Sequence, residues 1–365
     1  MSECLVSFKE TQNSEFQNSE FQSSEFPAVS IIIPVRNEEE YICACLSNID
    51  DQTYPNIVEV ICVDGLSNDS SRTLIEGYQS KNFQVRLLDN PKGIVPVAMN
   101  TGIRFSVGEI IVRIDSRTFI EPDYVANAVS LLQTMGAAGV GGPQVSDGIN
   151  YVSKVIAIAM NSRFGMGAAH RFPKDGMYVD TVYLGVYKKD TIEQVGYFDE
   201  RFVRNQDYEF NYRVSQQVGP LYCSPKIKST YIGRSSLAKL SRQFNQYGYW
   251  KTRTIRKHPR SLKVRQMVAP LLVTTLAVSG FLSLFIAKLF LVTSAIFLLY
   301  AAASIYFSFK QLGQYDSRYV VALPLVYGII HFSWGIGFIH GLIELVFSNK
   351  LRTEFQPTEA LGIST

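Results

Sequence analysis

The chain has 365 residues, which is enough for one large catalytic domain with an appendage or for two ordinary domains. Its formal net charge of +3 is too small to indicate a nucleic-acid-binding protein. The five cysteines are odd in number and show no CxxC spacing, so they indicate thiols in a reducing compartment rather than disulfides or a metal site.

The N-terminal segment, residues 1–27, is polar and repeats the tripeptide Ser-Glu-Phe. A segment of this composition cannot bury enough apolar surface to offset the entropy lost on ordering. We therefore expect a disordered tail outside the fold.

Strands and helices alternate after this tail. Strands are predicted at residues 29–34, 58–63, 85–88 and 110–114, and helices at 39–49, from Ser67 or Asp69 as the cap to about 78, and at 94–105. This alternation predicts βαβ units and a Rossmann-like, mainly parallel sheet. The strands are almost entirely apolar, which indicates that both faces of the sheet are covered.

Polar side chains follow the ends of these strands, where ligands bind in parallel sheets. Arg36 and Glu38 follow the first strand, Asp64 ends the second, and Asp115 follows the fourth. A carboxylate in such a place can accept hydrogen bonds from a base or ribose, or bind a metal. Each acid taken alone can equally be a turn residue.

A further acid, Asp207, opens a predicted helix, and two acids, Asp199 and Glu200, precede it closely. An acid at a helix start often serves only as a cap that favours the dipole. The neighbouring acids favour a functional site over a cap alone.

The last third of the chain changes from basic to apolar. Residues 236–258 predict a basic, partly aromatic helix, and seven Lys or Arg without an acid lie from Lys251 to Arg265. Three apolar stretches follow, at 267–286, 289–309 and 319–347, and each has the roughly 20 residues that a membrane span needs. The first two, separated only by Ala287-Lys288, predict a tight hairpin. The alternative is a buried, soluble helical domain.

Basic residues flanking membrane segments stay in the cytoplasm. This rule places Lys251–Arg265 and the catalytic part on the cytoplasmic side. Lys350 and Arg352 would then lie outside if all three stretches span, so a re-entrant or interfacial third segment stays open. The expected organisation is a tail at 1–27, a catalytic domain at 28–235, a basic juxtamembrane segment at 236–265, membrane helices at 266–348 and a tail at 349–365.

Taken together, these segments resemble family 2 glycosyltransferases of the GT-A fold over residues 28–255. The segments that carry the resemblance are the first strand and turn 29–38, Val63-Asp64-Gly65-Leu66-Ser67-Asn68-Asp69 in place of VDDGSxD, 98–102 in place of AxNxG, 115–117 in place of DxD, 205–207 in place of the ED motif, and 246–250 in place of QxxRW. Tyr249 replaces the Arg of the last motif, which disfavours a processive polymerase.

Residues 198–207 and 246–251, with the three apolar stretches, are most similar to glucosyltransferases of succinoglycan-type exopolysaccharide assembly. Enzymes of this type extend a sugar on a polyprenyl-diphosphate carrier. The resemblance therefore implies a UDP-sugar donor, a hexose and in particular glucose, a lipid-linked acceptor, and a bacterial-type inner membrane. A polyprenyl-phosphate acceptor, as in dolichol-phosphate-mannose synthase, and a non-catalytic scaffold are the alternatives.

The resemblance also implies a role for each residue, in a single displacement that inverts the anomeric centre. The implied residues are Pro34, Arg36, Glu38, Asp64, Asp115 and Arg117 for the nucleotide sugar, Asp115 for the metal, Asp207 for the base, Arg242, Gln246, Trp250 and Lys251 for the acceptor, and, less directly, Asp180, Gly185 and Arg213.

Arg117 stands where the family carries the second acid of DxD. A guanidinium cannot bind a metal, but it pairs well with phosphate. We expect Mg²⁺ or Mn²⁺ at Asp115, with a weaker metal dependence as a hypothesis.

Overall fold

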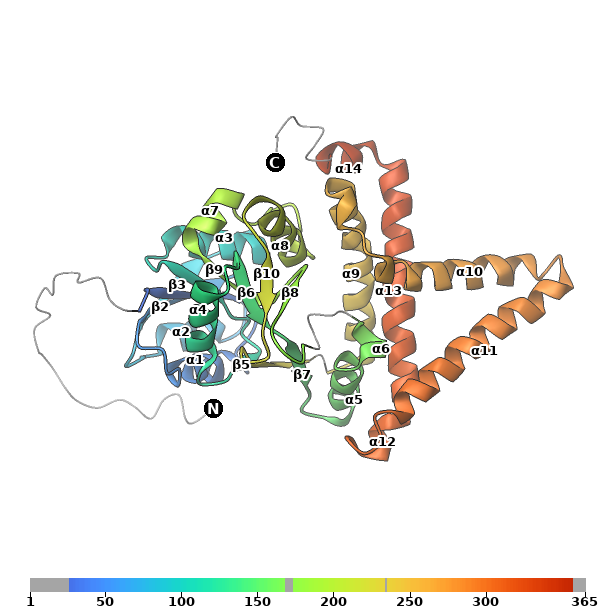
Figure 1. The fold of residues 1–365 in the computed structure, drawn as a ribbon, viewed down its shortest axis with the longest axis horizontal. Helices are drawn as coiled ribbons and strands as arrows, with labels where there is room; N and C mark the ends of the chain where they lie inside the picture. Colours follow the sequence, from blue (N-terminus) through green and yellow to red (C-terminus); the bar gives the residue numbers. More distant parts are fainter. Residues whose placement is uncertain (1–25, 168–172, 234, 357–365) are drawn as a thin grey trace, which may run out of the picture. The chain divides into compact units, whose positions relative to one another are not determined.

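A computed structural model describes residues 26–167, 173–233 and 235–356 (Figure 1). Most of the predicted N-terminal tail and residues 357–365 of the predicted C-terminal tail lie outside these described residues. The chain divides into two compact units. The sheet unit comprises Met1–Gly142, Asp175–Glu200 and Val218–Ser229, and the helical unit comprises Pro143–Lys174, Arg201–Gln217 and Thr230–Thr365.

The sheet unit contains an eight-stranded sheet in the order β3-β2-β1-β4-β9-β6-β10-β8. Its strands are β1 (Val29–Val35), β2 (Ile57–Asp64), β3 (Gln84–Asp89), β4 (Ile110–Arg113), β6 (Gly139–Gly142), β8 (Met177–Val179), β9 (Tyr183–Lys188) and β10 (Leu221–Cys223). The first four strands pair in parallel, as do β6 and β10, whereas β9 is antiparallel to β4 and β6, and β8 to β10. The predicted α/β class with a mixed, mainly parallel sheet is confirmed.

Helices cover both faces of this sheet, which is why β1 is buried at every position except Pro34. The helices are α1 (Ile42–Asp50), α2 (Ser71–Glu76), α3 (Val95–Phe105), α4 (Tyr124–Thr134) and α7 (Lys189–Val195), and a short strand β5 (Thr118–Ile120) follows β4. α1 and α4 share one apolar core with Ile31 and Ile33. α3 meets the other face at Gly102, where a Cβ would lie 2.6 Å from Ile32 Cγ2.

The predicted cap of the second helix is displaced: the cap position is Ser70, one residue after Asp69. α2 begins at Ser71 after Ser70, whose side chain makes no capping hydrogen bond. The Asp69 carboxylate accepts instead from the Ser71 N–H at 3.0 Å and from the Glu39 N–H at 3.2 Å. Asp69 is thus shared between the helix start and the loop after β1, a long-range partner that local sequence does not reveal.

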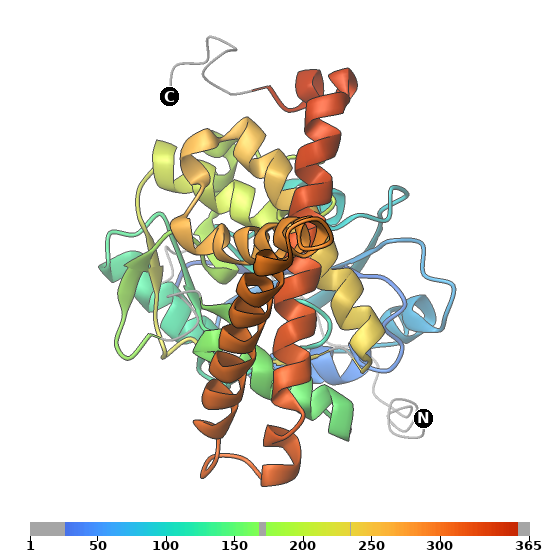
Figure 2. The same ribbon diagram turned by 90° about the vertical axis from the view of Figure 1, so that its right-hand side faces the viewer.

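The helical unit is built around two long helices, α9 (Leu237–Lys257) and α13 (Leu323–Phe347). Its other elements are β7 (Gln144–Asp147), α5 (Tyr151–Met160), α6 (Arg163–Met166), α8 (Gln206–Gln217), the 3-10 turns Pro259–Ser261 and Val264–Gln266, α10 (Val268–Leu282), α11 (Ala287–Phe309), α12 (Ser317–Val320) and α14 (Asn349–Glu354). One further strand, β11 (Ser229–Ile232), begins at the unit boundary. Figure 2 shows α10 and α11 in front of the upright α13.

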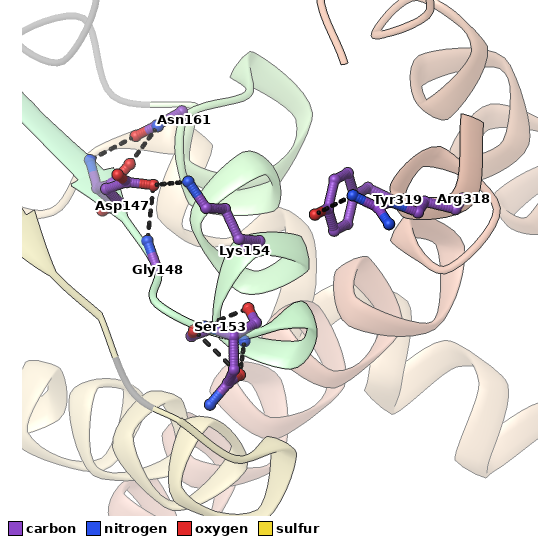
Figure 3. Close-up of polar contacts among 9 residues, drawn as sticks. Asp147, Gly148, Ser153, Lys154, Asn161, Arg318 and Tyr319 are labelled. Carbon is purple, nitrogen blue, oxygen red and sulfur yellow. Dashed lines mark hydrogen bonds and ion pairs between the residues drawn. The ribbon is translucent and has the colours of Figure 1, made fainter. Parts of the chain in front are cut away.

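A polar network holds α5 in place at its N-terminal end (Figure 3). Asn150 and Ser153 form a reciprocal capping box, in which each side chain accepts the other's backbone N–H at 2.9 Å. Asp147, at the end of β7, accepts from Lys154 at 3.0 Å. The apolar residues of α5 then pack with those of α9 and α13 in one core.

The backbones of α9 and α13 are in direct contact at glycine positions. A Cβ at Gly248 would lie 2.0 Å from the Trp334 carbonyl oxygen, and one at Gly337 would lie 2.0 Å from that of Asn245. Gly341, four residues on, faces the Tyr249 carbonyl. The GxxxG spacing in the third apolar stretch therefore serves close contact with a polar helix of the same unit.

Three helical segments are long and apolar enough to cross a membrane, namely Val264–Leu282, Ala287–Phe309 and Ser317–Phe347. They indicate membrane association. α10 and α11 form the predicted hairpin, joined by a 2.8 Å hydrogen bond from Thr293 to Ser279. The break, however, lies at residues 283–286, and the predicted separator Ala287-Lys288 already belongs to α11.

The glycine contacts generate a stability prediction. Gly248→Ala puts a methyl group against backbone that cannot yield without moving α13, so we expect a loss of about 1–3 kcal/mol in the free energy of unfolding. Unfolding of the full chain in detergent measures this loss. The matched control is Gly328→Ala on α13, where the added Cβ meets nothing within 4 Å. Equal destabilisation by both substitutions contradicts the packing role.

Candidate active site

The loops after β1 and β2 are locked to each other at the carboxyl edge of the sheet. The Asn37 N–H donates to Ser67 Oγ at 2.9 Å, and the Asn68 N–H donates to Asn37 Oδ1 at 2.9 Å. Asn37 and Leu66 both adopt the left-handed conformation, with φ of 54° and 60°. This mutual bonding holds two strained turns in fixed positions beside the strand ends.

Asp64 lies at the end of β2 and is 1% exposed. Its Oδ2 accepts from the Ser67 N–H at 3.2 Å and from Arg72 at 3.3 Å. Its Oδ1 is buried and has no hydrogen-bond partner among the described residues. A buried carboxylate oxygen without a donor costs free energy that a ligand N–H or O–H can recover. Asp64 can therefore accept a hydrogen bond from a bound molecule.

Arg72 extends this site along the sheet edge. It bridges Asp64 to Asp89, which accepts at 2.6 Å, and the two acids face each other in the β2–β3 register. The two carboxylates raise the pKa of the guanidinium, chiefly through the hydrogen bonds to Asp89 and Asp64. The sequence pattern identified Asp64 as a strand-end residue but gave no role to Arg72, which pairs with both acids.

Two of the predicted nucleotide-sugar residues pair with each other. Arg117 Nε donates to Glu38 Oε2 at 2.7 Å, and its guanidinium lies 4.7 Å from the centre of the Tyr41 ring. The Glu38 N–H donates to Ser71 Oγ at 2.8 Å. The cation that replaces the second DxD acid is thus held in a fixed position by an acid and an aromatic ring.

Asp115 follows β4 and remains 29% exposed at its side chain. Nε and Nη2 of Arg113 both approach its Oδ1, each at 2.9 Å. Over the described ranges, no three His, Cys, Asp or Glu side chains form a cluster that could hold a metal ion. A divalent cation at Asp115 would therefore have fewer than three such protein ligands and would take its other ligands from the substrate and water.

The remaining predicted residues of this edge are Pro34 and Arg36. The Pro34 carbonyl accepts from Ser116 Oγ at 3.4 Å, which connects β1 to the turn after β4. Arg36 is exposed and donates to the Gly93 carbonyl at 3.2 Å. All six predicted nucleotide-sugar residues thus come together at one edge of the sheet unit.

The Asn100 side chain fixes a neighbouring loop of the sheet unit. Its Nδ2 donates to the Phe198 carbonyl at 2.9 Å, and its Oδ1 accepts the Phe198 N–H at 2.9 Å. Glu200 accepts from Asn100 and from Lys92, at 3.1 and 2.8 Å. The hydrogen bond from Lys92 is the main reason that the pKa of the Glu200 carboxyl is lowered. The AxNxG-like segment therefore positions the loop that carries the acids before Asp207.

The predicted base, Asp207, is the second residue of α8 in the helical unit and is exposed. Its Oδ1 accepts the Tyr208 N–H at 2.8 Å. The segment before it is tied to α9, since Arg204 donates to Gln246 and Asn205 donates to the Tyr247 carbonyl, both at 3.1 Å. Asp207 thus presents a carboxylate on a backbone that α9 holds in place.

The four predicted acceptor residues all lie on α9, in different surroundings. Arg242 is exposed, whereas Trp250 packs near Phe202 with ring centres 6.3 Å apart. Lys251 is 3% exposed, and its ammonium lies 3.5 Å from the centre of the Tyr208 ring. Gln246 and Lys251 therefore contact the segment that carries Asp207.

A buried carboxylate, Glu209, joins α8 to the end of α9. Glu209 is 0% exposed and accepts from Arg213 at 2.8 and 2.9 Å, from Lys257 at 2.6 Å and from His258 at 3.0 Å. Burial raises the pKa of this carboxyl, but the His258 hydrogen bond and the two cations outweigh burial and hold the pKa well below its usual range. The sequence pattern did not indicate a role for Glu209 or His258. The i,i+4 spacing of Glu209 and Arg213 on a predicted helix does, however, favour an ion pair between these two residues.

The fold and the polar strand ends define a GT-A-like protein. A mannosyltransferase from Pyrobaculum calidifontis, solved with GDP-Man and Mn²⁺, aligns with a TM-score of 0.55 at 16% identity over 87% of this chain and 88% of that one. Residues 30–196 match the family described as "Glycosyl transferase family 2". Over this segment the chain is similar to family 2 glycosyltransferases.

Two curated relatives align over nearly their whole length. A dolichyl N-acetyl-alpha-D-glucosaminyl phosphate 3-beta-D-2,3-diacetamido-2,3-dideoxy-beta-D-glucuronosyltransferase of Methanococcus voltae is 29% identical over 87% of this chain and 97% of its own. The succinoglycan biosynthesis protein ExoA of Rhizobium meliloti is 27% identical over 86% of this chain and 94% of its own. Both similarities extend beyond the family match into the C-terminal region.

Proposed function

We propose that the protein transfers a hexose, glucose in particular, from a UDP-sugar to a sugar on a polyprenyl-diphosphate carrier, with inversion at the anomeric carbon. The observation that carries the proposal is the buried Asp64 oxygen that lacks a partner, at the strand edge beside Asp115 and Arg117. A uracil N–H or a ribose hydroxyl satisfies that oxygen. Pro34, Arg36 and Glu38 line the same edge and would fix the nucleotide's orientation.

The diphosphate belongs next to Asp115 and Arg117. The residues present fit a divalent cation, because Mg²⁺ and Mn²⁺ often take one or two carboxylates together with substrate phosphates. Such an ion neutralises the charge of the leaving diphosphate. Arg117, fixed by Glu38 and Tyr41, would pair directly with a phosphate and share this task. The Mn²⁺ in the Pyrobaculum relative's structure supports the cation.

Asp207 is the proposed general base. Its carboxylate takes the proton of the acceptor hydroxyl, whose oxygen forms a bond to the anomeric carbon as the bond to the diphosphate oxygen breaks. One base is sufficient for this single displacement, and it inverts the anomeric centre. The exposure of Asp207 and the anchoring of its segment to α9 suit a group that must meet a separate acceptor.

A lipid-linked acceptor is supported by the membrane helices and by one curated relative. The Methanococcus enzyme is named for a sugar acceptor on a dolichyl phosphate, whereas ExoA is named for succinoglycan biosynthesis. Arg242, Gln246, Trp250 and Lys251 on α9 are the proposed acceptor-side residues. With the basic segment to Arg265, they support a reaction at the cytoplasmic face of a bacterial-type inner membrane.

Asp207→Asn tests the reaction. Membranes containing the protein are incubated with lipid extract and labelled UDP-glucose, UDP-galactose or GDP-mannose. We expect labelled lipid-linked oligosaccharide from a UDP-hexose, and a fall in rate of about 10²–10⁴-fold in the mutant, because the base is lost. The matched control is Asp190→Asn, at the equivalent second position of α7 and also exposed.

Each outcome of this assay separates the alternatives. A labelled product with the mobility of a simple polyprenyl-phosphate sugar indicates the other acceptor. Absence of transfer from every donor favours a scaffold. Full activity of Asp207→Asn removes the assignment of the base.

Chelation tests the role of Arg117. We expect the wild type to keep part of its activity in excess EDTA, and Arg117→Ala to lose about 100-fold more under the same conditions, because no cation would then face the diphosphate. Arg104→Ala is the control, since Arg104 also stacks on an aromatic ring, that of Tyr197. Complete loss of wild-type activity on chelation contradicts a direct role for Arg117.

A further inference from the structure

The third apolar helix, α13, is packed along a helix that is too charged for the membrane interior. α9 and α13 run parallel, with contacts from Ser241–Ser333 at 2.8 Å to Arg253–Glu344 at 2.7 Å. These contacts cover 12 residue steps of α9, or about 18 Å of helix. The glycine contacts in between leave no room for lipid between the two helices.

α9 itself carries six Lys or Arg and no Asp or Glu between Leu237 and Lys257. A basic side chain at the centre of a membrane helix costs roughly 2.5–3.5 kcal/mol on the insertion scale. One of the six, Arg253, is neutralised by Glu344 of α13, at 1% exposure. Lys257 pairs with Glu209 of α8 at 2.6 Å. The other four basic residues exclude α9 from the hydrocarbon core. A helix that follows α9 side by side cannot cross that core either.

α13 also has an outer face that is apolar and covered by neither α9 nor α10. Leu325, Ile336, Ile343 and Phe347 are exposed, and their spacings place them on this one side of the helix. α10 packs on a different side, about 100° around the helix from Ile336, where a Cβ at Gly335 would meet Val273 and Ala269. Figures 1 and 2 both place α9 on one side of α13 and the α10–α11 hairpin on the other.

The α10–α11 hairpin has the features of an inserted element. Its tip, residues 283–286, exposes Leu284, Phe285 and Ile286. α11 has 23 residues, or about 34 Å of helix, which matches a hydrocarbon core of about 30 Å. Lys288 and Lys310 stand at its two ends, where their ammonium groups can reach the headgroups.

We infer that α13 lies in the plane of the membrane surface beneath α9, with its outer face against acyl chains, and that only the α10–α11 hairpin enters the hydrocarbon core. The chain then enters and leaves from the same face. The C-terminus, with Lys350 and Arg352, lies in the same compartment as the sheet unit, as the positive-inside rule requires. This topology is independent of the proposed transfer reaction, because it rests on the packing and charge of α9.

Cysteine labelling of the full chain in membrane vesicles tests this topology. Val107→Cys, on an exposed loop of the sheet unit, marks the compartment of that unit. Asn349→Cys reports the end of α13, and Ser283→Cys the hairpin tip. A membrane-impermeant maleimide is applied to inverted and to right-side-out vesicles, and the wild type gives the background of the native thiols.

We expect the cysteines at 107 and 349 to be labelled in inverted vesicles and protected in right-side-out ones, whereas the cysteine at 283 is not labelled in inverted vesicles. Labelling at 349 only in right-side-out vesicles means that α13 crosses the membrane and overturns the inference. Equal labelling at 107 and 283 in inverted vesicles means that the hairpin is not inserted and overturns it as well. Neither result depends on sugar transfer.

Discussion

The backbone contact between α9 and α13 is the constraint on which the helical unit depends. Glycines on both helices allow this contact, and each of them faces a carbonyl oxygen of the other helix. α9 then supports the segment that carries Asp207, through Gln246, Tyr247 and the Glu209 cluster. One helix therefore couples the proposed base to the apolar part of the chain. This coupling suits the lipid-linked acceptor that we propose.

In the sheet unit, the parallel register of the strands is the corresponding constraint. Val35 of β1 faces Asp64 of β2, and Asp64 faces Asp89 of β3. The carboxyl ends of these strands therefore coincide, and the turns that follow β1 and β2 bond to each other. Among the described residues, one buried carboxylate oxygen of Asp64 has no partner at this edge. Unsatisfied buried groups are rare in folded proteins, so we propose that this one marks the place of a ligand.

Sequence patterns predicted the features that depend on nearby residues of the chain. The alternation of apolar strands and helices gave the α/β class, and the charges after strand ends gave the candidate residues at one edge. Pairings between distant residues were not predictable. Asn100 holds Phe198 across 98 residues, and Glu209 binds His258 across 49. The cap position was missed by one residue, since Ser70 holds it, and the second partner of the Asp69 carboxylate in another loop was not predictable. Hydropathy could not show that α13 packs against a charged helix.

The most direct test of the account is calorimetric binding of UDP to the wild type and to Asp64→Asn. The central claim is that the Asp64 carboxylate receives the nucleotide, so we expect the isosteric amide to weaken binding about tenfold or more, which corresponds to about 1.4 kcal/mol. Asp89→Asn is the matched control, because Asp89 shares Arg72 with Asp64 but is exposed. Equal affinity of the wild type and Asp64→Asn for UDP, with both proteins folded, contradicts the account.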